Sequence, residues 1–434
     1  GLVHCPLWSG NIQVAIKTQI MRLNYFLEVL YMDIFFNKLG IPKELFWGYV
    51  GLIFFMLGST IECTWFSATL IDLGYGVNFV SSIFSFYGLF VAIVSWISGA
   101  LVNRFSIRKV MNIGVFLYIV SLLLLLLSLS MRINIGIAIA YALRGSAYPL
   151  FAYSFLIWIT LRTKKEQLGR ATSWFWLCFN LGMNIIAPVF SARLLENISF
   201  EIVFILGAVM VILGTFFALI LNKDVVKQDK RNVSLGKELV KGLVLLGKRP
   251  RVLVGMIVKI INNIGAFGFV IMMPILLISH GYTLVQWTSI WAMTYIFNCL
   301  ATIIFGHLGD RYGWRKIVVF FSGTLTALSC LMIAFVIYHY PGNYILLILA
   351  FMLFSIGVAA YAPLSALLPA MVPDNKVEAV SILNLGSGLS NFVGPLLVTL
   401  LFEKTSGLVV LIVFAFLYAA SSLMSVVLKT PEEL

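Results

Sequence analysis

Charged side chains are scarce in this chain of 434 residues. They make up 11% of it, whereas hydrophobic residues make up 61%. Soluble domains contain about 25% charged and about 45 to 50% apolar residues, so the composition excludes an ordinary soluble protein. Apolar runs recur at the length of ~20 residues that an α-helix needs to cross a bilayer. We predict twelve spans: 47–70, 79–102, 109–129, 132–157, 172–195, 200–221, 252–278, 286–308, 316–338, 344–368, 378–402 and 407–428.

Cysteine and histidine are scarce too, with five and four residues. Cys63, Cys178, Cys299 and Cys330 fall inside predicted helices, and no CxxC spacing occurs. The histidines show no metal-ligand spacing. We therefore expect no disulfide, no metal site and no cofactor.

Motifs of catalysis and of nucleotide binding are missing as well. The chain has no nucleophile elbow, no HExxH motif, no phosphate-binding P-loop and no long soluble segment. We therefore expect neither an enzyme nor a nucleotide-driven pump. A channel or a transporter-like sensor stays open at this point, because fold does not determine function.

Negative charge is the rarer sign, and the formal net charge is +13. Basic residues gather on one side of the predicted spans, where the connections hold twenty Lys and Arg. The opposite connections hold only Arg132, Arg193 and Lys404. This asymmetry follows the positive-inside rule and places both termini in the cytoplasm. The charge therefore indicates orientation in a lipid bilayer and excludes a nucleic-acid partner.

Two charged stretches repeat at a distance of 207 positions. The first hairpin reads Gly99-Ala-Leu-Val-Asn-Arg-Phe-Ser-Ile-Arg-Lys109, and the second reads Gly306-His-Leu-Gly-Asp-Arg-Tyr-Gly-Trp-Arg-Lys316. The same offset pairs Gly48 with Gly255, Gly58 with Gly265, Asn184 with Asn391 and Pro188 with Pro395. A repeat of this length indicates that one six-helix unit has been duplicated.

The repeat defines the domain organisation. We expect an amino-terminal cytoplasmic extension at 1–46, a six-helix bundle at 47–221, a Lys-rich cytoplasmic linker with a short surface helix at 222–250, a second bundle at 251–428 and a cytoplasmic tail at 429–434. Met32 offers a suitable start, so we interpret 1–31 as an upstream extension or mispredicted start. An ordinary cytoplasmic tail is the alternative.

Twelve helices in two halves, with a basic hairpin after the second and eighth, resemble the major facilitator superfamily over 46–428. The family hairpin reads Gly-x-x-x-Asp-Arg-x-Gly-x-Arg/Lys-Arg/Lys; the second hairpin fits it, whereas the first has Asn103 and Ser106 in place of the acid and the second glycine. The resemblance implies gating residues that latch the cytoplasmic side in the outward-facing state: Gly99, Asn103, Arg104, Arg108, Lys109, Gly306, Asp310, Arg311, Gly313, Arg315 and Lys316. It implies a weaker first latch, which Asn103→Asp should strengthen.

Several strings are similar to the polyol permease branch, the bacterial ribitol and arabinitol transporters. They are Trp47-Gly-Tyr-Val50, Phe86-Tyr-Gly-Leu89, Ser95-Trp-Ile-Ser-Gly99, Arg144-Gly-Ser-Ala-Tyr-Pro-Leu-Phe-Ala-Tyr-Ser154, Ser173-Trp-Phe-Trp176, Lys259-Ile-Ile-Asn262, Phe267-Gly-Phe-Val-Ile-Met-Met-Pro274 and Ser381-Ile-Leu-Asn-Leu-Gly-Ser-Gly-Leu-Ser-Asn-Phe392. The branch carries an acid three residues before the retained Glu62, where this chain has Ser59. The resemblance implies a monomer in the bacterial cytoplasmic membrane.

Three ionisable residues lie well inside predicted spans, where a charge is costly and needs a partner or a task. Glu62 is the candidate proton-coupling carboxylate, with Arg144 as its partner; the alternative is a permanent ion pair that only locks helices. Arg144 is equally a candidate donor to substrate hydroxyls. Lys259 is a candidate binding residue, or a lysine that extends to the cytoplasmic side.

Amides and aromatic rings complete the predicted binding site. Amides donate and accept hydrogen bonds, as sugar-alcohol hydroxyls do, and rings offer apolar faces. The candidates are Tyr148, Trp174, Trp176, Asn180, Asn184, Asn262, Asn263, Asn298, Tyr361, Asn384 and Asn391. Interhelical hydrogen bonding and packing are the alternative roles. We predict proton-coupled uptake of a pentitol such as ribitol or arabinitol by alternating access. An organic anion, another solute or a sensor role is the alternative.

Overall fold

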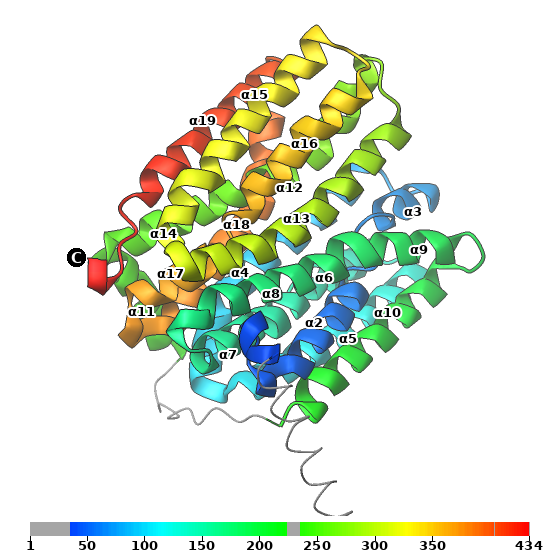
Figure 1. Cartoon of the computed structure of the whole chain (residues 1–434). Coiled ribbons are helices and arrows are strands. Elements are labelled where there is room, and N and C mark those ends of the chain that lie inside the picture. The colour runs from blue at the N-terminus through cyan, green and yellow to red at the C-terminus, as the bar shows by residue number, and fades with distance from the viewer. Residues whose placement is uncertain (1–34, 224–234, 403, 434) are drawn as a thin grey trace, which may run out of the picture.

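A computed structural model describes residues 35–223, 235–402 and 404–433, and their regular structure is helical (Figure 1). The all-α fold class is therefore confirmed. The interpretation of 1–31 as an extension, and part of the predicted linker, lie outside the described residues. The first half contains η1 (Lys43–Leu45), α2 (Phe46–Ser59), α3 (Phe66–Asp72), α4 (Val77–Phe105), α5 (Ile107–Ser130), α6 (Asn134–Arg144), η2 (Pro149–Tyr153), α7 (Ser154–Arg162), η3 (Lys165–Gln167), α8 (Leu168–Asn180), η4 (Leu181–Ile186), α9 (Ala187–Leu195), α10 (Phe200–Thr215) and η5 (Phe216–Leu221).

The linker helix α11 (Leu235–Lys248) leads into the second half. That half contains α12 (Pro250–Ser279), α13 (Leu284–Tyr312), α14 (Trp314–Ile317), η6 (Val318–Ser322), α15 (Gly323–His339), α16 (Tyr344–Ala359), α17 (Leu364–Met371), η7 (Pro373–Asn375), α18 (Lys376–Phe402), α19 (Gly407–Ser425) and η8 (Pro431–Glu433). Large apolar side chains such as Ile135, Phe416 and Leu423 are more than two-thirds exposed. Such exposure suits a protein whose solvent is lipid.

Eleven helical segments of the described chain are long and apolar enough to cross a membrane. The first predicted span, 47–70, is different because it breaks into α2 and α3. Thr60 lies in the break, and its hydroxyl donates to the Met56 carbonyl at 2.6 Å. A hydroxyl that hydrogen-bonds to a nearby backbone carbonyl offers the backbone an alternative to regular helix hydrogen bonds. Ser59, Thr60 and Glu62 supply polar groups at this point.

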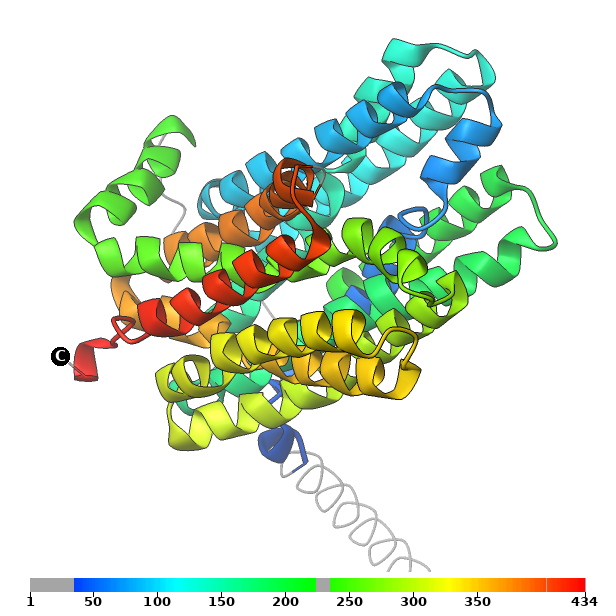
Figure 2. The ribbon, with the colours of Figure 1, turned by 90° about the horizontal axis from the view of Figure 1, so that it is seen from above.

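The two halves meet along two helix pairs, α4 with α18 and α8 with α13. Figure 1 shows α8 beside α13, and Figure 2 shows α4, in blue, beside α18, in orange. The leading glycine of each hairpin lies in these contacts. A Cβ atom at Gly99 would lie 2.9 Å from the Ser381 Cβ, and one at Gly306 would lie 2.7 Å from the Ser173 Cβ. The glycines therefore permit a close approach that no larger residue allows.

Candidate functional site

A cavity of about 110 Å³ lies between the two halves. Its walls come from η2, α8 and η4 of the first half and from α12, α13, α16 and α18 of the second. Nine of the predicted binding residues line it: Tyr148, Trp176, Asn180, Asn184, Lys259, Asn262, Asn263, Asn298 and Asn391. Residues far apart in the sequence thus meet around one cavity.

Four predicted binding residues lie away from the cavity wall. Arg144 is buried in the first half, and Trp174 donates from Nε1 to the Leu39 carbonyl at 3.0 Å. The hydroxyl of Tyr361 is hydrogen-bonded to Ser421 inside the second half. Asn384 is fully buried on α18, and its amide atoms have no hydrogen-bond partner among the described residues.

Several lining residues were not predicted, among them Tyr153, Phe179, Tyr295, Thr302 and Ser387. Helical spacing contained a signal for three of them. Tyr295 and Thr302 lie three positions before and four after Asn298, and Ser387 lies four before Asn391. Such spacing puts side chains on the same helix face.

Lys259 of α12 is the charged residue of the cavity wall. Its exposed fraction is 3%, and its Nζ lies 4.1 Å from the centroid of the Trp176 ring, as in a cation–π contact. Among the described lining residues there is no Asp or Glu. The structure therefore places Lys259 in the wall of the cavity, and its ammonium faces an aromatic surface from the other half.

The asparagines of the wall are only partly satisfied by the protein. Asn184 donates from Nδ2 to the Asn180 Oδ1 at 2.9 Å, and Asn298 donates to the Ser355 carbonyl at 3.2 Å. The Asn262 Oδ1 is buried and has no partner among the described residues. An amide offers two donors and an acceptor, so this wall keeps hydrogen-bonding capacity for a ligand.

Glu62 and Arg144 form a buried, bidentate ion pair outside the cavity. Arg144 donates from Nε to Glu62 Oε1 and from Nη2 to Glu62 Oε2, the second at 2.8 Å. Arg144 Nη2 also donates to the Tyr118 hydroxyl at 3.1 Å, and that hydroxyl donates to the Gly58 carbonyl at 3.0 Å. The carboxylate lies in the break between α2 and α3, and the arginine ends α6.

The second half has no such pair at the matching position. Phe269, 207 positions after Glu62, lies among Phe351, Phe354 and Phe414, with ring centroids 6.0, 5.0 and 5.6 Å away. Replacement of a buried ion pair by well-packed apolar residues is often neutral or stabilising. The charged network is therefore one of the features that distinguish the two halves.

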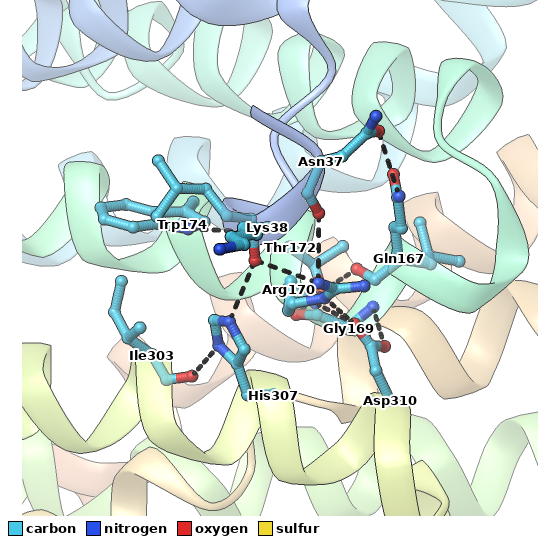
Figure 3. A network of polar contacts seen from close by, with 12 residues as sticks. Asn37, Lys38, Gln167, Gly169, Arg170, Thr172, Trp174, Ile303, His307 and Asp310 are labelled. Carbon is cyan, nitrogen blue, oxygen red and sulfur yellow. Dashed lines mark hydrogen bonds and ion pairs between the residues drawn. The ribbon is translucent and has the colours of Figure 1, made fainter. Parts of the chain in front are cut away.

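Asp310 of the second hairpin joins the two halves (Figure 3). Its carboxylate accepts from the backbone N–H groups of Gly169 and Arg170 at 2.9 and 3.0 Å, from Arg170 Nε at 2.9 Å and from Trp314 Nε1 at 2.9 Å. Gly169 is required here, because a Cβ would lie 2.4 Å from Asp310 Oδ1. The carboxylate thus binds the amino-terminal end of α8, where anions are favoured. We name the contacts of Asp310 with Gly169 and Arg170 of α8 the Asp310 latch.

The segment before α2 lies beside the Asp310 latch. Arg170 donates from Nη1 to the Asn37 and Lys38 carbonyls at 3.3 and 3.1 Å. A ring nitrogen of His307 lies 3.3 Å from the same Lys38 oxygen (Figure 3). The described part of the amino-terminal extension therefore contacts both halves.

The first hairpin makes a different contact between the halves. Asn103 donates from Nδ2 to Glu378 Oε1 at 3.4 Å. Glu378 lies on α18 of the second half, 207 positions after Ala171 of α8. In the contact of the first hairpin, the acid therefore lies in the opposite half and not in the hairpin itself. Ser106 has φ +88°, in the same left-handed region as its counterpart Gly313 at +103°.

Two other predicted gating residues bind within their own half. Arg108 donates from Nη1 to the Leu219 carbonyl at 2.6 Å, and Arg315 donates from Nη1 to the Val426 carbonyl at 3.2 Å. These carbonyls are also 207 positions apart, so the two arginines bind equivalent positions at the end of the last long helix of each half. The remaining basic gating residues, Arg104, Lys109, Arg311 and Lys316, are exposed at this end of the molecule.

Comparisons with known proteins agree on one family. The family model described as Major Facilitator Superfamily matches residues 48–313 and 285–434. The chain is 37% identical to the alpha-ketoglutarate permease of Bacillus subtilis over 92% of each chain. It is 29% identical to the D-arabinitol transporter of Klebsiella pneumoniae, covering 88% of this chain and 92% of that one. In fold it resembles the human organic anion transporter MFSD10 (TETRAN), with TM-score 0.70, 14% identity and coverage of 88% of this chain and 100% of that chain.

Proposed function

The chain belongs to the Major Facilitator Superfamily and is a multi-pass membrane transporter, and we propose that its substrate is a small carboxylate with further hydroxyl or carbonyl oxygens. The expectation that it is no enzyme is confirmed by its relatives. The resemblance to bacterial polyol transporters is also confirmed, whereas the identity of the substrate stays a proposal.

Lys259 is the observation that carries this proposal. A buried ammonium without a charged partner is costly, and no described lining residue is acidic. A substrate carboxylate would supply the missing charge. The adjoining turn of α12 presents Asn262 and Asn263 to the same cavity, where their amides suit the other oxygens of such a ligand. The name of the Bacillus subtilis relative points to the same chemical class.

A sugar alcohol is the second candidate. The asparagine-rich wall favours it, and so does the relative named as a D-arabinitol transporter. A neutral polyol, however, gives no counter-charge to Lys259. A carboxylate that also bears hydroxyl groups would use both features of the wall, which is why we rank it first.

Proton coupling through Glu62 is part of the proposal. The carboxylate and Arg144 have side chains with no exposed surface, so a change of protonation at Glu62 would alter the balance of charge inside the first half. We further propose that the protein works as a monomer in a bacterial cytoplasmic membrane, with both termini in the cytoplasm and access alternating between the two sides.

Counterflow in proteoliposomes tests the substrate. Labelled α-ketoglutarate should enter vesicles preloaded with the same compound, and gluconate should compete better than D-arabinitol or ribitol. Lys259→Gln should weaken carboxylate binding by roughly 10- to 100-fold, since a hydrogen bond to a charged group contributes about 1.5–3 kcal/mol. Lys404→Gln, which removes the same charge from an exposed position, is the matched control.

The opposite pattern would overturn the carboxylate proposal. Counterflow of ribitol or D-arabinitol that ignores carboxylates and survives Lys259→Gln would establish the polyol candidate in its place. Absence of counterflow with every compound, in protein that is folded, would favour a sensor.

A further inference from the structure

Trp176 fastens α8 of the first half to the second half at the edge of the cavity. Its Nε1 donates to the Ser365 Oγ of α17 at 2.7 Å, while its ring face meets the Lys259 Nζ at 4.1 Å. Trp176, Lys259 and Ser365 are 9%, 3% and 1% exposed. We name these three residues the Trp176 clamp. Both of its contacts cross from one half to the other.

One face of α8 connects this clamp to the Asp310 latch. Arg170, Ser173, Trp176 and Asn180 follow one another at spacings of three, three and four residues, which keeps them on one side of a helix. Arg170 meets Asp310, Ser173 packs against Gly306, and Asn180 lines the cavity. Six residues of helix between Arg170 and Trp176 correspond to about 9 Å.

We propose that the Trp176 clamp is the gate through which substrate binding releases the two halves at the hairpin end. A carboxylate in the cavity competes with the Trp176 ring for the Lys259 ammonium. A carboxylate offers Lys259 an opposite charge and charge-assisted hydrogen bonds, which the ring quadrupole does not supply. Binding therefore draws Lys259 from the ring, and of the two contacts of the clamp only the Ser365 hydrogen bond then remains.

This inference rests on the proposed carboxylate substrate, but part of it is measurable without any substrate. Removal of the Trp176 donor or of its acceptor weakens the clamp directly. Trp176→Phe keeps a ring beneath Lys259 and loses the N–H group, and Ser365→Ala removes the acceptor. Trp174→Phe is the matched control, because Trp174 lies on the same helix and donates to Leu39 of the amino-terminal extension, not to the second half.

Cysteine labelling measures how often the two halves part at the hairpin end, which is the end of the molecule where the hairpins 99–109 and 306–316 lie. The full-length protein is reconstituted with its five native cysteines replaced by alanine and Ser173→Cys as the only thiol. Ser173 is fully buried against Gly306, so a water-soluble maleimide reaches it only when the halves part. A parallel series with Ser121→Cys, fully buried inside the first half, detects unfolding.

Without substrate, Trp176→Phe and Ser365→Ala should label roughly 2- to 10-fold faster than the parent, in keeping with the loss of one hydrogen bond. Trp174→Phe should label at the parent rate, and Ser121→Cys should stay unlabelled in all variants. α-Ketoglutarate should accelerate labelling of the parent, and it should do so in Trp176→Phe as well, because that variant keeps the ring from which the carboxylate draws Lys259.

Equal ligand-free rates in Trp176→Phe, Ser365→Ala and Trp174→Phe would overturn the clamp, whatever the substrate is. Faster ligand-free labelling of the two clamp variants, combined with no response of the parent to α-ketoglutarate, would support the clamp and overturn the carboxylate proposal. The two failures are therefore distinguishable.

Discussion

Asn103 of the first hairpin faces Glu378 of the second half, with Asn103 Nδ2 3.4 Å from Glu378 Oε1. In the second hairpin the acid is Asp310, and its partners in the first half lie on α8. Both latches thus contain one carboxylate, but the carboxylates belong to opposite sides of their contacts. The absence of an acid at position 103 is accompanied by an acid at position 378.

Asn103→Asp should therefore weaken the first latch. The sequence pattern predicts the reverse, but the new carboxylate would lie against that of Glu378, and like charges across an interface cost up to several kcal/mol. We expect labelling of Ser173→Cys to rise on the order of tenfold. Asn112→Asp adds the same charge at an exposed site nearby and should have little effect.

A second substitution makes this test specific. Asn103→Asp combined with Glu378→Gln returns the acid to the first hairpin and leaves an amide opposite it, so the labelling rate should fall back toward that of the parent. Slower labelling in the single variant Asn103→Asp would show that Glu378 does not act on this position.

Ser106→Gly should stabilise the protein. Ser106 has φ +88°, and its side chain makes no capping hydrogen bond to the helix that follows. Its ψ of 152° places it in a backbone region that is essentially confined to glycine and costs other residues about 1–3 kcal/mol, so the glycine should raise the melting temperature in detergent by an amount equivalent to about 1 kcal/mol. Gly313→Ser should lower it. Unchanged melting in both variants would contradict the assigned strain.

Glu62→Gln should abolish accumulation driven by a pH gradient while exchange of substrate persists in folded protein. It should also lower stability by about 3–5 kcal/mol, because the variant leaves Arg144 as a buried, unpaired charge. The double variant Glu62→Gln with Arg144→Gln should recover part of the stability but none of the accumulation. If Glu62→Gln accumulated substrate at the parent level, the ion pair would have only a structural role, that of holding helices together.

Arg108→Gln and Arg315→Gln should lower stability without opening the hairpin end. Each arginine binds a carbonyl in its own half, so its loss frees a helix end. Hydrogen bonds from charged donors contribute about 1.5–3 kcal/mol, less where water competes. Melting temperatures should therefore fall while Ser173→Cys labelling stays at the parent rate. Faster labelling in either variant would instead give that arginine a direct part in the latch.

Much of the cavity was predictable because its residues follow local rules. Asn180 and Asn184, Asn262 and Asn263, and Asn298 are polar interruptions of apolar helices, and a polar residue inside a membrane is expensive unless it faces the interior. The sequence did not distinguish Trp176, which lines the cavity, from Trp174, which lies away from it. Neighbouring aromatic residues on one helix look alike in the sequence.

The sequence by itself determined the membrane class and most of the polar residues of the cavity, and its repeat at 207 positions predicts a duplicated six-helix unit. Each of these depends on segment length, repeat spacing or helical periodicity, which are properties of the chain read locally. Only the tertiary structure decided that Glu62 pairs with Arg144, that Lys259 meets Trp176, and that the acid of the first hairpin's latch stands at position 378. Those contacts join residues from distant segments. The sequence suggests Glu62 and Arg144 as partners, because each is a costly charge inside a span, but only the packing of the helices decides which of the possible contacts form.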